Sequence, residues 1–405
     1  MESGGRGWAV LTRGLALLLL VVVGTDVRVE AAPGDLDPSF GTGGIVTTTV
    51  LDRYRGTYVT DLMQDGQGRI IAAGIGPGAF LVRYHPDGTL DTSFGTNGVT
   101  IGGLYYWLPP PYALATDGRI YAGGFADQEG RDSILIRFDA DGRPDASFGT
   151  DGVRMLDFEP SELVPVADGK LLIAGTCLVR MLPDGSYDPG FATSCWRGFR
   201  SIAFPTPDTI VAAGIDEQQG PPAIFRVTIG RFLADGSPDP AAGALPVTAS
   251  PPLPFRPILV AVQPDGRIVA VDEGYEGVIN LARVNLDGSF DATFGTDGVV
   301  TIMRPWGWGS WVGALAVQRD GRILVGGRAY VTDDDGYDFF VARFLPDGAL
   351  DPSFGDAGIV VTDVARPPYG YQDVVYALLE DRDGRILAGG ATHDGGDGGP
   401  IAVAR

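Results

Sequence analysis

The sequence predicts an all-β protein, a seven-bladed β-propeller of four-stranded antiparallel blades, and three observations support this prediction. The motif Leu90–Gly95 (LDTSFG) recurs seven times at intervals of about 43 to 60 residues, a period typical of solenoid and propeller units. Short apolar or β-branched runs joined by Asp-Gly turns precede each copy, which is a hairpin pattern. No segment shows the sustained 3.6-residue periodicity of an amphipathic helix.

Residues 1–31 are predicted to be a signal peptide that precedes a single propeller domain over residues 32–405. Arg6 and Arg13 supply a positive n-region, and residues 14–24 form an apolar stretch too short to span a bilayer. Val29 and Ala31 give the small-x-small pattern of a cleavage site, which places the mature start near Ala32. An uncleaved membrane anchor is the alternative.

The repeat at residues 313–361 gives the clearest view of one blade. Runs 313–318 and 323–327 flank the turn at 319–322, and run 339–344 leads through the turn at 346–348 into the motif strand. An Arg ends the third run of each repeat, and in six copies an Asp follows eight residues later. We interpret these Arg and Asp residues as structural pairs that join the third and fourth strands.

The two ends of the domain are predicted to share one blade. Residues 401–405 have the pattern of a third strand, and residues 34–49 have the pattern of a fourth strand. Pairing the N-terminal strand with the C-terminal strand would complete a sheet and remove two open edges, which closes the ring.

Cys177 and Cys195 are the two cysteines of the chain. In an exported protein an even pair favours a disulfide. The two residues lie on runs that would pair around the turn at 183–186, almost opposite each other, where the Cβ atoms of antiparallel strands are close enough to bridge. We therefore predict a structural disulfide.

The pairing of GRILVGG-like strands with the DGxLDxSFGxxG motif resembles the delta-60 repeat, a family of propeller repeats of unassigned function. The order of strand, Asp-Gly-Arg turn, strand, Pro-Asp-Gly turn and strand is similar to NHL-type propellers. The resemblance covers essentially the whole mature chain and implies architecture and export without implying an activity. Gly190, Ala192 and the pair at 241–242 depart from the motif, so the blades that contain them are expected to be irregular.

The longest and most divergent connections are predicted to lie on one face of the ring, where repeat proteins commonly bind ligands. The connections between blades carry aromatic residues that suit stacking on sugar rings or anchoring a protein. The candidate ligand-binding residues are Tyr54, Tyr106, Trp107, Trp306, Trp308, Trp311, Tyr369 and Tyr371. The alternative is that these aromatic residues only pack over the blade ends.

The loops between second and third strands are acidic, and the run Asp333, Asp335 and Asp338 is the candidate metal site. Clustered carboxylates with glycine turns can bind Ca²⁺ through oxygen ligands. Solvated loop charge is the alternative, because the run lacks the remaining ligands of an EF-hand loop, including the glutamate at its twelfth position.

The charge and the scarcity of histidine limit the functions to consider. With 51 acidic and 30 basic side chains the net charge is −21, which disfavours nucleic acid and anionic lipid surfaces as partners. Two histidines leave little material for a histidine triad or zinc site, and the chain contains no P-loop or nucleophile elbow.

The sequence therefore predicts a secreted or periplasmic, non-enzymatic binding scaffold for a glycan or protein ligand. We expect a monomer without stable membrane insertion and without a cofactor other than calcium. The rival prediction is a calcium-assisted hydrolase or lyase with carboxylates at the channel mouth. A structural surface module without a specific ligand is the third alternative.

Overall fold

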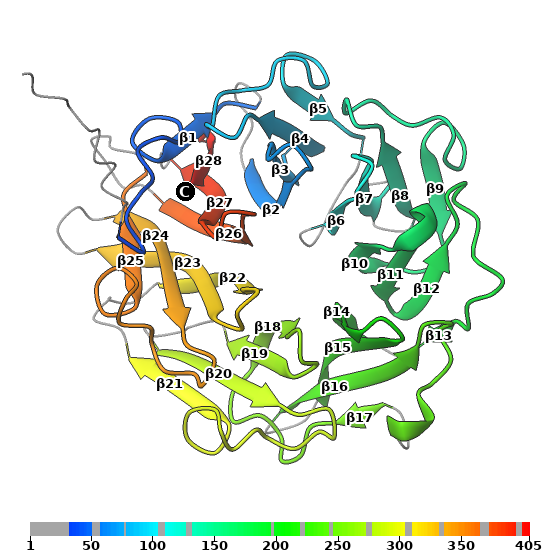
Figure 1. Cartoon of the computed structure of the whole chain (residues 1–405), viewed down its shortest axis with the longest axis vertical. Coiled ribbons are helices and arrows are strands. Elements are labelled where there is room, and N and C mark those ends of the chain that lie inside the picture. Colours follow the sequence, from blue (N-terminus) through cyan, green and yellow to red (C-terminus); the bar gives the residue numbers. More distant parts are fainter. Residues whose placement is uncertain are drawn as a thin grey trace, which may run out of the picture. The chain divides into compact units, whose positions relative to one another are not determined.

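Five sheets of four antiparallel strands and one sheet of eight strands make up the described chain (Figure 1). The structure is a computed structural model, and it describes residues 32–50, 57–76, 78–103, 110–126, 132–195, 198–218, 223–242, 246–272, 278–303, 310–331, 336–364, 372–393 and 399–405. All of these residues belong to one compact unit, Ala32–Arg405.

The four-stranded sheets follow one another along the chain. The first contains β2 (Tyr58–Gln64), β3 (Ile70–Ile75), β4 (Ala79–Tyr84) and β5 (Val99–Ile101), and the second contains β6 (Tyr112–Leu114), β7 (Ile120–Phe125), β8 (Ser133–Phe138) and β9 (Val153–Leu156). The third contains β10 (Pro160–Pro165), β11 (Leu171–Gly175), β12 (Cys177–Met181) and β13 (Ser194–Cys195). The fourth contains β14 (Phe199–Thr206), β15 (Thr209–Gln218), β16 (Ile224–Leu233) and β17 (Val247–Thr248), and the fifth contains β18 (Pro257–Val262), β19 (Ile268–Asp272), β20 (Val278–Val284) and β21 (Val299–Met303).

The eight-stranded sheet joins the C-terminal strands to the first strand of the domain. It contains β22 (Trp311–Val317), β23 (Ile323–Val331), β24 (Gly336–Phe344), β25 (Ile359–Thr362), β26 (Gln372–Glu380), β27 (Ile386–His393), β28 (Ile401–Ala404) and β1 (Ile45–Thr48). Two 3₁₀ turns, η1 (Ala167–Gly169) and η2 (Pro240–Ala242), complete the described elements. Strand β1 pairs antiparallel with β28, from Ile45 opposite Ala404 to Thr48 opposite Ile401, which is the strand closure that the sequence predicted.

The predicted count of seven separate four-stranded blades is wrong. The described strands form five separate four-stranded blades, and the other eight strands form one continuous sheet. The join is a parallel bridge between Tyr337 of β24 and Gln372 of β26. We call the boundary between neighbouring repeats of four strands a seam. At this seam both strands are nine residues long and reach each other, whereas the corresponding strands of the first sheet, β4 and β2, have only six and seven residues.

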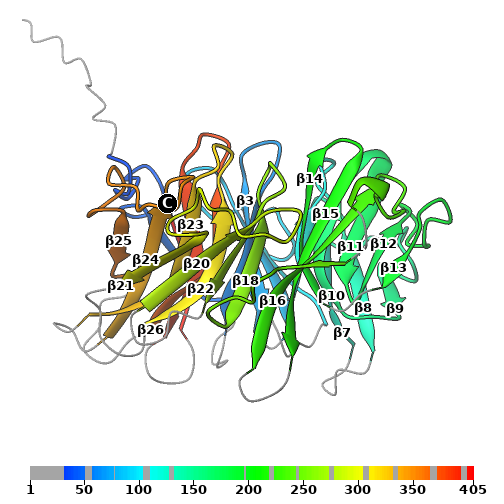
Figure 2. The same ribbon diagram turned by 90° about the horizontal axis from the view of Figure 1, so that it is seen from below.

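Seven strands lie innermost, one from each four-stranded sheet and two from the eight-stranded sheet, and they contact one another around a closed circuit. The contacts run from β2 to β6, β10, β14, β18, β22 and β26, and β26 contacts β2 again (Figure 1). Viewed from the side, the strands run between two faces (Figure 2). We call them the turn face, which carries Asp-Gly turns such as 265–267 and 320–322, and the loop face at the opposite strand ends.

The core lies between neighbouring sheets. Phe94 and Phe138 of two successive repeats pack with Ile120 and Tyr112 in one buried cluster, and comparable clusters fill the other seams. The motif phenylalanines are each at most 6% exposed, as expected of inter-blade packing. These residues are Phe40, Phe94, Phe148, Phe191, Phe294 and Phe354.

The recurrent Arg and Asp residues form ion pairs that are buried or partly buried, and we call each pair a latch. Arg83 is 2% exposed and donates from Nε to Asp91 Oδ2 at 2.7 Å, while its carbon Cζ lies 4.5 Å from the centre of the Phe94 ring. Its Nη1 donates to the carbonyl oxygen of Ala140 in the next sheet at 2.6 Å. The pairs are Arg83–Asp91, Arg137–Asp145, Arg180–Asp188, Arg231–Asp239, Arg283–Asp291, Arg343–Asp351 and Arg405–Asp37. The structural interpretation is confirmed, and five of the seven arginines also donate to a backbone carbonyl oxygen in a turn of the neighbouring sheet.

The predicted disulfide is present. Cys177 lies opposite Cys195 in the pairing of β12 with β13, and their Cα atoms are 3.9 Å apart. The bridge fastens the two-residue edge strand β13 to its sheet, although Gly190 and Ala192 weaken the motif there.

Candidate functional site at the loop face

Most of the residues predicted to bind a ligand lie outside the described part of the chain. These are Tyr54, Tyr106, Trp107, Trp306, Trp308, Tyr369 and Tyr371, together with Asp333 and Asp335 of the predicted metal site. Trp311 and Asp338 are described, and both lie on the eight-stranded sheet near its loop face. The candidate site is therefore built around these two residues.

Trp311 begins a row of aromatic side chains on three neighbouring inner strands. The Trp311 ring on β22 lies 5.6 Å from the Tyr376 ring on β26, and Tyr376 lies 4.9 Å from Tyr58 on β2. All three side chains are half-buried. Burial raises the pKa of both tyrosines, so their hydroxyl groups are neutral donors at physiological pH.

A β-bulge explains why Tyr376 belongs to this row. Val375 pairs with Gly390 and Ala377 with Gly389, so Tyr376 is an extra residue without a partner on β27. Such a bulge redirects the side chain of the extra residue. In the sequence, Tyr376 stands within an apolar run and resembles an ordinary core residue, which is why sequence reasoning missed it.

Arg328 connects the aromatic row to the seam between β24 and β26. It stands opposite Trp311 in the pairing of β22 with β23, and its Nη1 donates to Gln372 Oε1 at 2.9 Å. Its guanidinium carbon lies 4.5 Å from the centre of the Tyr337 ring, a cation–π contact. A positive charge and an amide therefore flank the row.

Three carboxylates converge on the other side of the same seam. Asp338 on β24, Asp363 after β25 and Asp373 on β26 each place a carboxylate oxygen within 4.8 Å of the other two. Asp373 is 1% exposed and accepts the backbone N–H of Val364 at 3.0 Å, whereas Asp363 is exposed. The chemistry of this group suits a hard cation such as Ca²⁺. The sequence identified Asp338 but grouped it with loop neighbours, because the bridge between β24 and β26 has no local sequence signal.

Asp61 and Glu162 form a second acidic feature on the inner strands. Each immediately follows the bulge of its strand, β2 or β10, and both are half-buried. Asp61 accepts the N–H of Leu62 at 2.7 Å, and burial raises its pKa to about 7. Burial, with a smaller contribution from the charge of Asp61, raises the pKa of Glu162 to about 8. Both carboxyl groups therefore keep their protons to a higher pH than an exposed Asp or Glu does.

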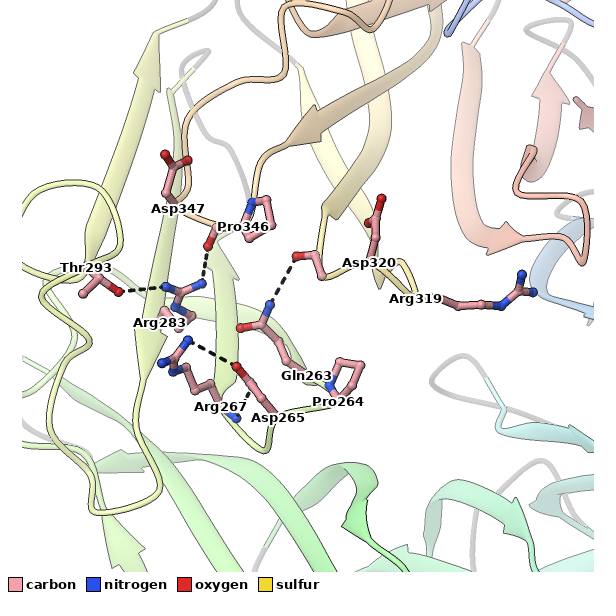
Figure 3. Close-up of a pocket in the computed structure, with 11 residues that line it drawn as sticks. Gln263, Pro264, Asp265, Arg267, Arg283, Thr293, Arg319, Asp320, Pro346 and Asp347 are labelled. Atoms are coloured by element: carbon pink, nitrogen blue, oxygen red, sulfur yellow. Dashed lines mark hydrogen bonds and ion pairs between the residues drawn. The ribbon is translucent and has the colours of Figure 1, made fainter.

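A cavity of about 470 Å³ opens on the turn face, between the fifth sheet and the eight-stranded sheet (Figure 3). Its cationic groups are already paired. Arg283 donates to Asp291, to Thr293 and to the carbonyl oxygen of Pro346, and Arg267 contacts both Asp265 and Asp291. The Arg319 guanidinium extends away from the cavity, toward the carbonyl oxygen of Asp381 (Figure 3). We interpret the cavity as a gap between two neighbouring sheets whose charged side chains already pair with one another.

A known family supports the propeller fold without indicating a reaction. Residues 68–94, 115–148, 263–294 and 318–354 match a β-propeller domain of unknown function, DUF5122. These segments cover four of the repeats, so the chain is similar to a propeller repeat family. A comparison with curated proteins gives no match.

The solved structures that match this chain have little sequence in common with it. A protein of unknown function from Dyadobacter fermentans is 11% identical, covers 91% of this chain and 99% of its own, and has a TM-score of 0.41. A glucose dehydrogenase is 13% identical, with coverage of 89% and 99% and a TM-score of 0.42. The Pan2 WD40 domain of Neurospora crassa is 11% identical, with coverage of 66% and 71% and a TM-score of 0.41.

Proposed function

We propose that this protein is an exported β-propeller scaffold that binds a carbohydrate at the loop face of the eight-stranded sheet. The row of Trp311, Tyr376 and Tyr58 carries the proposal. Three stiff rings on neighbouring strands offer stacking surfaces at low cost in conformational entropy. Such rings match the apolar faces of sugar residues.

The polar groups around the row favour a sugar over an apolar peptide. The Arg328 guanidinium and the Gln372 amide flank the row as donors and acceptors for hydroxyl groups, and the carboxylates on the other side of the seam offer further acceptors. The tyrosine hydroxyls add neutral donors beside the rings. A ligand with many hydroxyl groups and flat apolar faces uses both kinds of contact, whereas an apolar peptide would displace water from the polar groups without replacing its hydrogen bonds.

Export is part of this proposal. The apolar run at residues 14–24 and the pattern ending at Ala31 support a secretory signal. The Cys177–Cys195 disulfide is compatible with an oxidising compartment. The part of the chain that the structure describes contains no helix with the length and hydropathy of a membrane span.

Affinity electrophoresis through gels that contain individual soluble polysaccharides tests the binding site. We expect at least one polysaccharide to retard the protein and Trp311→Ala to weaken this binding about ten-fold or more, equivalent to ~1.4 kcal/mol. Met303→Ala is the matched control, because Met303 is 84% exposed and ends β21 on the same face without joining the row. Equal losses in both variants, or no retardation of the wild type by any polysaccharide, would contradict the proposal.

The convergence of Asp338, Asp363 and Asp373 favours calcium-assisted hydrolysis or lysis of a polysaccharide as the second candidate function. A calcium-dependent thermal shift that is lost in Asp363→Asn, together with release of new reducing ends, would support it over simple binding. Asp363 is the exposed member of the group, so this substitution leaves the buried contact of Asp373 in place. A thermal shift without new reducing ends would instead indicate a calcium-stabilised binding scaffold.

A further inference from the structure

Residues 33–34 take the place of a turn where the N-terminal segment packs against the repeat that contains Gly355. In four other seams, the motif glycine of one repeat donates its N–H to the backbone carbonyl oxygen of the Asp in the next Asp-Gly turn. The N–H of Gly41 donates to the carbonyl oxygen of Asp87 at 2.7 Å, and the N–H of Gly295 donates to that of Asp347 at 2.8 Å. Gly355 makes the same bond at 2.9 Å, but its acceptor is the carbonyl oxygen of Pro33.

The backbone around Pro33 has the conformation of the turn that it replaces. Gly34 has φ +100°, and the corresponding Gly88 has φ +84°. A Cβ atom at Gly34 would lie 2.5 Å from the N atom of Gly355, just as one at Gly88 would lie 2.8 Å from the N atom of Gly41. Residues 33–34 therefore occupy the place of an Asp-Gly pair, and the seam needs Pro33.

Ala32 closes this substitute turn. Its backbone nitrogen donates to Asp35 Oδ2 at 2.9 Å, and its carbonyl oxygen accepts the N–H of Asp35 at 2.9 Å. Both residues are exposed. A free amino group at Ala32 would keep the first contact and add charge to it, because an ammonium would face a carboxylate.

We propose that an endoprotease of the signal-peptidase class hydrolyses the Ala31–Ala32 peptide bond and that the new N-terminus is part of the seam. Water adds across the amide, so that Ala31 leaves as a carboxylate and the nitrogen of Ala32 becomes an ammonium that carries both protons of the water. Val29 and Ala31 provide the small side chains that such proteases accept. Cleavage two residues later, after Pro33, would remove the carbonyl oxygen that accepts the N–H of Gly355. The inference depends on export and is independent of carbohydrate binding.

Secretion of the full chain followed by N-terminal sequencing and intact mass tests the cleavage position. The expected mature protein begins at Ala32. Competitive labelling with acetic anhydride across pH then measures the pKa of the α-amine, which we expect about half a unit to one unit above its usual ~7.7–8.0 because the carboxylate of Asp35 stabilises the ammonium. Asp35→Asn should return this pKa to the usual range, whereas Asp216→Asn, which changes an exposed carboxylate on β15, should leave it raised.

Each result decides the inference. A secreted chain that keeps residues before Ala32, or one that begins after Pro33, would overturn the cleavage position. An α-amine pKa that is unchanged by Asp35→Asn would overturn the ion pair even if cleavage occurs at Ala32. Failure of polysaccharide binding would leave both measurements unaffected, so the two proposals are tested separately.

Discussion

The turn face and the loop face of the eight-stranded sheet use charged residues in opposite ways. On the turn face each latch arginine meets an aspartate, as Arg343 meets Asp351 at 2.9 Å, and the geometry repeats from sheet to sheet. On the loop face Asp338, Asp363 and Asp373 face one another, and Trp311 and Tyr376 keep part of their rings exposed. The difference indicates that the repeated residues build the ring, whereas the residues that break the repeat are available for recognition.

Removing a complete latch should have the largest effect on stability. Arg283 is 3% exposed and contacts Asp291, Thr293, the carbonyl oxygen of Pro346 and the Phe294 ring. Arg283→Ala leaves Asp291 buried without its main partner, so we expect a loss of ~3–5 kcal/mol in the free energy of unfolding by urea denaturation.

Arg143→Ala is the matched control for that experiment. The Arg143 side chain is 65% exposed, and its Nη1 lies 3.4 Å from Oδ2 of Asp141, which is 60% exposed, so the loss of this surface pair should cost about 1 kcal/mol or less. Similar losses for the two substitutions would contradict the account of the latches as buried structural units.

Removing the disulfide should have a somewhat smaller effect. The bridge closes a segment with a sequence separation of 18 residues, for which loop-closure entropy gives ~3 kcal/mol. We expect the Cys177→Ser, Cys195→Ser double variant to unfold at lower urea concentration than the oxidised wild type. Reduction of the wild type should lower its midpoint by a similar amount, and an unchanged midpoint in both cases would show that the bridge adds no stability.

The acids on the inner strands should make stability fall as pH rises. The pKa of Asp61 in the folded protein is raised from 3.8 to about 7, and that of Glu162 from 4.5 to about 8, because burial disfavours their charged forms. The folded state therefore retains protons that the unfolded state releases, and stability declines between about pH 4 and pH 8. We expect a higher melting temperature at pH 5 than at pH 8.5.

The Asp61→Asn, Glu162→Gln double variant should show a smaller difference in melting temperature between pH 5 and pH 8.5, and an unchanged difference would rule out these acids as its source.

At the acidic end, hydrogen bonds from Lys170 and the N–H of Gly190, together with Arg180, hold the pKa of Asp188 at about 2. That latch should lose its contribution as pH falls from about 4 toward 2.

The sequence predicted the parts of the structure that depend on local patterns. Asp-Gly turns located the hairpins, the positions of Cys177 and Cys195 located the disulfide, and the unfinished repeats at the two ends located the pairing of β1 with β28. The bridge between Tyr337 and Gln372 was not predictable, because it depends on how far two strands extend across a seam. The convergence of three aspartates and the exposure of Tyr376 follow from that bridge and from a bulge, and neither has a local sequence pattern.

Polysaccharide binding by matched variants of the two faces distinguishes recognition at the loop face from recognition at the turn face. Trp311→Ala alters the loop face, and Arg319→Ala alters an exposed residue beside the cavity on the turn face. The dissociation constant of each folded variant for the polysaccharide that retards the wild type should be measured by calorimetry. The account predicts about ten-fold or greater weakening for Trp311→Ala and wild-type affinity for Arg319→Ala. Wild-type affinity in Trp311→Ala together with weakened binding in Arg319→Ala would contradict it.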